Sequence, residues 1–184
     1  MTYEDPGWGE VFGRGMLRPW RASALGQGLD GVSVLRALFL VFVIALFLYL
    51  FVVFQIVEED GDPARSWAVW GIALLGLASI AGSRWTATRP LKTSSERELA
   101  NSFRTNLFIG IAFSETPALL GLALAFVESS RWLYVEGLVF SLVALWMVAP
   151  TQGQIERRQR DVTAAGSPLS LGEALSPSYP RTES

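Results

Sequence analysis

The chain contains no cysteine and no histidine, and its only lysine is Lys92. Without cysteine no disulfide framework can form, and without histidine the commonest general base and metal ligand is missing. A nucleophilic serine would also need such a base. We therefore expect a protein that is not an enzyme and has no catalytic residues, metal site or cofactor. The net charge of −2 provides no general attraction to nucleic acid, so nucleic acid is not expected as a partner.

Long apolar runs make up much of the sequence. Hydrophobic residues account for 51% of the chain, and four stretches are strongly apolar, at about 34–57, 67–84, 104–127 and 132–149. A bilayer core of about 30 Å needs roughly 20 helical residues, so each stretch can form one span. The sequence predicts an all-α, polytopic membrane protein with four transmembrane helices.

Basic residues alternate with acidic ones from loop to loop. Residues 58–66 carry four acids and one arginine, whereas the loop between the second and third runs is basic. The basic residues around this loop are Arg84, Arg89, Lys92, Arg97 and Arg104. By the positive-inside rule, this loop and both termini are expected in the cytoplasm. Fourteen arginines against one lysine are typical of a GC-rich bacterial genome, so we expect a bacterial plasma membrane.

The segments outside the four runs differ in character. Residues 1–33 mix aromatics with arginines and are expected to form a cytoplasmic segment that rests on anionic headgroups. Residues 150–184 begin as a basic tail, whose Arg157, Arg158 and Arg160 are expected to contact lipid headgroups; a docking site for a soluble partner is the alternative. From about Ala164 the tail is rich in serine and proline, so disorder is predicted.

In the loop before the third apolar run, Ser95 and Glu98 have the spacing of a capping box, which begins a helix.

Small residues recur along the second and third runs. On each run they gather on one side at helical spacing, which lets two helix backbones approach closely. The sequence therefore predicts that residues 34–149 form a four-helix transmembrane domain with a tight central hairpin. The residues expected to pack this hairpin are Gly71, Gly82, Gly110, Ser114 and Gly121.

Glu115 lies near the middle of the third run, where a charged carboxylate costs at least ~2.5 kcal/mol. No lysine, arginine or histidine lies in the apolar interior of the other runs, so we expect the neutral acid at rest. As an acid it could donate a hydrogen bond to Ser79, to Thr116 or to a backbone carbonyl. Pro117 lacks an N–H and frees the carbonyl one turn earlier. Glu115, Thr116, Pro117 and Ser79 are therefore the predicted proton-binding residues.

The stretch "LFIGIAFSETPALLG", residues 107–121, resembles the carboxylate-bearing helix of the F-type ATP synthase c subunit, the proteolipid of the rotor ring. In that family an "LFIG-x-A" sequence leads to a glutamate, a proline, two aliphatic residues and a glycine. The matching residues here are Leu107, Phe108, Ile109, Gly110, Ala112, Glu115, Pro117, Leu119, Leu120 and Gly121. The resemblance covers residues 67–127 and implies that Glu115 exchanges an ion. Because the preceding helix lacks the glutamine of sodium-selective relatives, the implied ion is a proton.

Two interpretations of function remain open. In the first, the chain is an integral membrane protein whose Glu115 binds a proton, within a homo-oligomer or a larger membrane complex. In the second, it is a non-enzymatic membrane scaffold or assembly subunit, and Glu115 has a purely structural role. Membrane lipids are expected partners in both.

Overall fold

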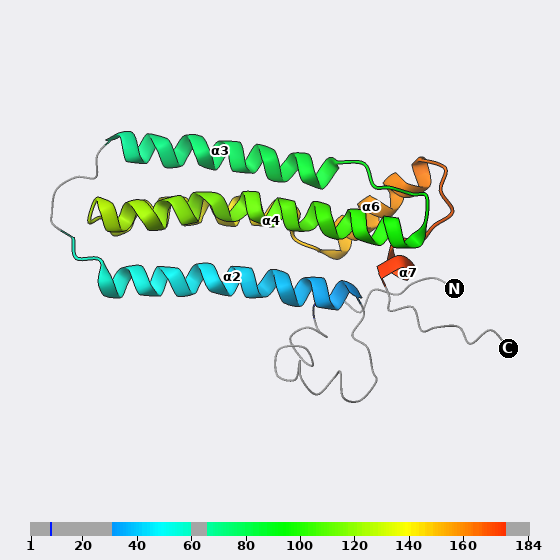
Figure 1. Cartoon of the computed structure of the whole chain (residues 1–184), viewed down its shortest axis with the longest axis horizontal. Helices are drawn as coiled ribbons and strands as arrows, with labels where there is room; N and C mark the ends of the chain where they lie inside the picture. The colour runs from blue at the N-terminus through cyan, green and yellow to red at the C-terminus, as the bar shows by residue number, and fades with distance from the viewer. Residues whose placement is uncertain (1–7, 9–30, 60–65, 176–184) are drawn as a thin grey trace, which may run out of the picture. The chain divides into compact units, whose positions relative to one another are not determined.

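The computed structural model of the chain describes residue 8 and residues 31–59 and 66–175. All regular secondary structure in these ranges is helical, as predicted. The helices are α2 (Gly31–Ile56), α3 (Ser66–Thr88), α4 (Glu96–Val127), α5 (Arg131–Val148), α6 (Gln152–Ala164) and α7 (Leu171–Leu175) (Figure 1). The predicted headgroup-binding segment 1–33 lies outside the described residues, apart from Trp8 and the first turn of α2.

Four helices, α2 to α5, are long and apolar enough to cross a membrane. Their outward faces carry large hydrophobic side chains, which suits contact with lipid. On α2, for example, Val41, Leu48 and Phe51 are 60%, 58% and 62% exposed. These exposed apolar surfaces are what a soluble protein would bury.

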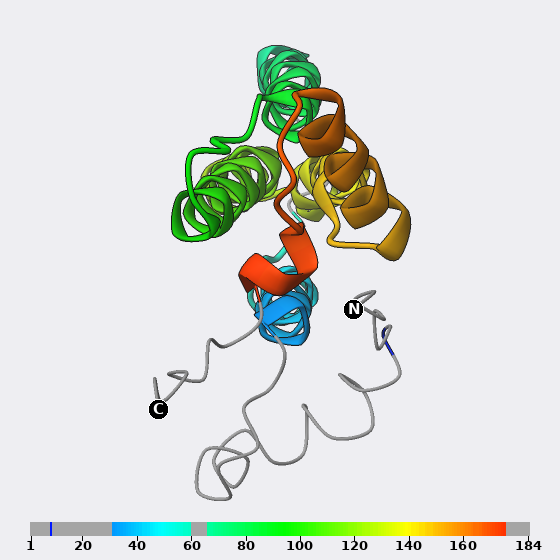
Figure 2. The same cartoon turned by 90° about the vertical axis from the view of Figure 1, so that its right-hand side faces the viewer.

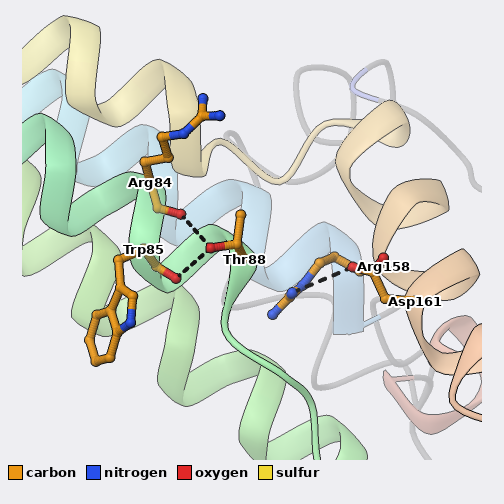
Figure 3. A network of polar contacts seen from close by, with 5 residues as sticks. All are labelled: Arg84, Trp85, Thr88, Arg158 and Asp161. Atoms are coloured by element: carbon orange, nitrogen blue, oxygen red, sulfur yellow. Dashed lines mark hydrogen bonds and ion pairs between the residues drawn. The ribbon is translucent and has the colours of Figure 1, made fainter.

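The ends of α3 and α4 extend beyond the predicted spans. Helix α4 begins at Glu96 rather than near residue 104, because the hydroxyl of Ser95 accepts a hydrogen bond from the Glu98 N–H at 3.2 Å. This contact is the predicted cap. Helix α3 continues to Thr88, whose hydroxyl donates to the carbonyls of Arg84 and Trp85 at 3.1 Å each (Figure 3). The apolar runs alone do not mark these ends, since residues 85–88 and 96–103 mix polar with apolar side chains.

The chain divides into two compact units. One comprises residues 41–89 and 106–148, and we call it the helix core. Within the helix core α4 and α5 lie between α2 and α3 (Figure 2). Helix α5 packs along α3, and their contact includes a cluster of apolar residues shared with α4. These residues are Ala68, Ile72, Leu120, Leu124, Leu133 and Phe140.

The other unit comprises residues 1–40, 90–105 and 149–184, and we call it the end unit. Its tail corrects the prediction of disorder from Ala164 onward. Leu171 and Leu175 of α7 are 0% and 1% exposed, and the Gln159 side chain bonds the loop between α6 and α7 at two points. Two leucines one turn apart bury enough apolar surface to order a segment that is otherwise rich in serine and proline. Residues 176–184 lie outside the described residues.

Candidate functional site

Glu115 lies in the middle of α4, and its side chain is half-buried. Within the described residues, no hydrogen bond or ion pair involves its carboxyl. Thr116 and Ser79, which were expected to accept a hydrogen bond from this carboxyl, do not contact it through a hydrogen bond in the described residues. Thr116 donates to the carbonyl of Ala112 in its own helix at 2.8 Å. Ser79 is 2% exposed on α3, and no hydrogen bond joins it to Glu115 in the described part of the chain. The structure therefore does not assemble the predicted set around the carboxyl.

Pro117 lies inside α4 and interrupts its backbone hydrogen bonds. Helix α5 packs directly against this turn. A Cβ atom on Gly137 would clash with the carbonyl oxygen of Pro117, and the hydroxyl of Ser141 accepts a hydrogen bond from the Ala118 N–H at 3.0 Å. A neighbouring helix therefore packs against the turn at Pro117, and the role predicted for Pro117 in proton binding stays a prediction.

A pair of serines joins α3 to α4 inside the helix core. The hydroxyl of Ser114 donates to the Gly110 carbonyl at 2.8 Å. It lies 2.9 Å from the hydroxyl of Ser83, which therefore donates to it. Both serines are fully buried. Because all of these polar groups have partners, they stabilise the contact between the two helices rather than offering a free ligand.

The predicted packing residues fall into three groups. Gly82, Gly110 and Ser114 lie where α3 meets α4; a Cβ on Gly82 would approach the Phe113 ring to 3.1 Å. Gly121 faces α5 instead, because its Cβ position lies 2.6 Å from the Leu133 carbonyl oxygen. Gly71 has no atom of the described neighbouring elements within 4 Å. Its predicted role in packing is wrong.

Residues that the sequence reasoning missed lie mainly on α5. Gly137 and Ser141 provide the contacts to α4, and the ring of Phe140 fills the space beside Gly76 of α3. Tyr134 is fully buried and donates from its hydroxyl to the Leu46 carbonyl of α2 at 2.6 Å. The spacing of Gly137 and Ser141, one turn apart, is the signal that could have identified α5 as a packing helix.

The three arginines predicted at lipid headgroups are not equivalent. Arg157 and Arg160 are exposed on α6, whereas the side chain of Arg158 is 5% exposed and lies 3.7 Å from the carboxylate of Asp161 (Figure 3). Burial lowers the pKa of Arg158, and the Asp161 carboxylate opposes this shift. The residue lies on the buried face of α6 with Ile155 and Val162. Its predicted contact with headgroups is therefore wrong.

The fold defines an all-helical protein with four candidate membrane-spanning helices. Among the described residues, no group of acidic side chains is placed to hold a metal ion. No protein-family model matches the chain, and no curated protein or solved structure matches it either. Its function is therefore inferred from its own residues.

Proposed function

We propose that the chain is a multi-pass protein of a bacterial plasma membrane in which Glu115 binds and releases a proton. The observation that carries this proposal is the half-buried carboxyl in the middle of α4, which has no partner within the described residues. As a charged group it would cost at least ~2.5 kcal/mol at the centre of a bilayer. Binding a proton removes that charge without requiring a cation from the protein.

The distribution of charge supports the membrane placement. Basic residues follow α3, and acids such as Glu58 and Glu59 follow α2, so both termini and the α3–α4 loop belong in the cytoplasm by the positive-inside rule. At the end of α3 the guanidinium of Arg89 lies 5.2 Å from the centre of the Trp85 ring. An exposed tryptophan beside an arginine is typical of the boundary between lipid and water.

The surroundings of Glu115 favour a proton over a metal ion. Hard cations need several oxygen ligands, but the nearby hydroxyls on α4 already donate within the helix. Thr116 donates to Ala112 and Ser114 to Gly110. The resemblance of residues 107–121 to the ATP synthase c subunit points to the same ion, and α3 contains no glutamine.

Infrared spectroscopy tests proton binding directly. The full-length protein in lipid vesicles is compared with Glu115→Gln across a pH series, and Glu128→Gln, at the turn after α4, serves as the control. If Glu115 holds a proton, the protonated-carboxyl C=O band should persist at pH 7 in the wild type and in Glu128→Gln, which leaves Glu115 in place. It should disappear in Glu115→Gln. Identical spectra for the wild type and Glu115→Gln at pH 7 would reject the proposal.

A second candidate function is a membrane scaffold in which Glu115 is only structural. The packing of α5 against Pro117 and the Ser83–Ser114 contact favour it, because they provide a stable core that needs no titrating group. The Glu115→Gln variant distinguishes the two candidate functions, because the glutamine side chain can still form hydrogen bonds but cannot bind and release a proton. A scaffold would still assemble with its co-purifying chains and retain its cellular function, whereas a proton-binding protein would keep the assembly and lose function.

A further inference from the structure

Glu115 lies near the centre of a regularly spaced row of six residues on the outward face of α4. The row takes alternately every fourth and every third residue and consists of Phe108, Ala112, Glu115, Leu119, Leu122 and Phe126. The phenylalanines and Leu119 are 42%, 46% and 47% exposed, Ala112 is also exposed, and the other two are half-buried. We call this row the α4 seam. It lies apart from the buried residues of the same helix, such as Ser114 and Ala118.

Residues at this spacing line one narrow face of a helix. In a left-handed coiled coil such a face stays turned toward a partner helix over several turns. Transmembrane helices also associate in this geometry, and small residues such as Ala112 allow a close approach. The α4 seam can therefore accommodate a second helix.

The carboxyl at the centre of the seam identifies that second helix. A neutral carboxylic acid has one O–H donor and one carbonyl acceptor, so its best match is another carboxylic acid, with which it exchanges two hydrogen bonds. In a two-fold dimer about the membrane normal, identical residues of parallel helices meet at the same depth. Glu115 then faces Glu115 of the other copy, and a polar residue within an apolar seam fixes the register.

We propose that α4 associates through the α4 seam with α4 of a second copy of this chain, in a parallel dimer in which the two protonated Glu115 side chains hydrogen bond to each other. The inference rests on the multi-pass placement and the neutral acid of the proposed function. It adds the partner of that acid, which the described residues of a single chain do not supply.

Cysteine cross-linking tests the seam, because the natural chain contains no cysteine. Ala112→Cys and Leu119→Cys are made singly in the full-length chain and oxidised in native membranes. The matched control is Leu77→Cys, at an outward position of α3 that is 59% exposed. A disulfide needs Cα atoms within about 7 Å, so the two seam variants should form disulfide-linked dimers and Leu77→Cys should remain monomeric. Monomers at both seam positions, equal dimer yields at Leu77, or a disulfide to a different protein would overturn the proposal.

The acid pair is tested by adding Glu115→Ala or Glu115→Gln to Leu119→Cys. Interhelical hydrogen bonds in membranes are modest, so Glu115→Ala should weaken self-association roughly tenfold. Glu115→Gln, whose amide also exchanges two hydrogen bonds, should stay within about threefold of the parent. Two tagged copies purified together in mild detergent give a second measure of association that needs no cysteine. Equal dimer formation by all three proteins would overturn the acid pair.

The results also separate this inference from the proposed function. If infrared spectra show a protonated Glu115 while the seam cysteines remain monomeric, the dimer is overturned and proton binding stands. If the seam cysteines cross-link while Glu115 is ionised, both proton binding and the acid pair are overturned.

Discussion

The hydroxyl of Ser141 in α5 accepts a hydrogen bond from the backbone N–H of Ala118 in α4, with 3.0 Å between the two atoms. Ser141 is fully buried, and Ala118 directly follows Pro117. A proline inside a transmembrane helix is tolerated when neighbouring groups satisfy the backbone that it disturbs. Ser141 performs this role from another helix, so the contact between α4 and α5 depends on it.

Replacing Ser141 by alanine should therefore destabilise the helix core. The Ser141→Ala variant loses one buried interhelical hydrogen bond, and we expect the free energy of unfolding to fall by about 0.5–1.5 kcal/mol. Reversible unfolding in mixed micelles measures this change. The control is Ser79→Ala, because Ser79 is also buried but its hydroxyl makes no hydrogen bond within the described residues. Equal losses in the two variants would contradict the assigned role of Ser141.

Two glycines should respond in opposite ways to the same substitution. In Gly137→Ala the added methyl would overlap the Pro117 carbonyl and lie 3.2 Å from the Cα of Ala118. Because both obstacles are backbone, α5 must move away from α4, and we expect a loss of about 1–3 kcal/mol in unfolding free energy. Gly71→Ala places its methyl in open space and should be neutral or slightly stabilising. Thermal unfolding in one detergent compares them, and a Gly71→Ala variant as unstable as Gly137→Ala would contradict the packing described above.

The four long helices were predictable because their physical requirement is local: each needs a long enough run of apolar residues. The contacts between them were not, since a glycine on a helix does not reveal which neighbour approaches it. Gly71 and Gly82 lie on the same helix and were both predicted to pack the hairpin, yet only at Gly82 would an added Cβ meet another helix.

The same limit applies to charge. Arg157 and Arg158 are adjacent in the sequence, but the helical turn of α6 places Arg157 on its exposed face and Arg158 on its buried face. The mid-helix position of Glu115 could be read from the sequence. Within the described residues no hydrogen bond joins Ser79 to the Glu115 carboxyl, which depends on how α3 and α4 are rotated, and Thr116 donates within α4 instead. Sequence spacing gives a residue's face on its own helix but not the direction of that face.

The ordered tail makes a prediction about Gln159. Its side-chain oxygen accepts from the Leu171 N–H at 2.6 Å, and its amide nitrogen donates to the Leu169 carbonyl at 3.1 Å. Gln159→Ala removes both contacts and should open the loop between α6 and α7, so limited proteolysis there should be about tenfold faster. Gln152→Ala is the control, because Gln152 bonds only Glu156 of its own helix, on the surface. Unchanged cleavage in Gln159→Ala would show that Leu171 and Leu175 alone order the tail.

Substitutions of the arginines of α6 should affect lipid binding and stability separately. Arg157 and Arg160 are exposed, and a basic residue near an anionic surface contributes about 1 kcal/mol to binding. Arg157→Ala combined with Arg160→Ala should therefore reduce the anionic phospholipid that co-purifies with the protein and leave thermal unfolding nearly unchanged. Arg158→Ala should do the reverse, because it removes a buried side chain and its packing, at about 2 kcal/mol or more. Lipid analysis and thermal unfolding of the same preparations give both quantities. If Arg158→Ala lost lipid as strongly as the double variant while remaining fully stable, its guanidinium would have to reach the membrane surface, and the buried position in α6 would be contradicted.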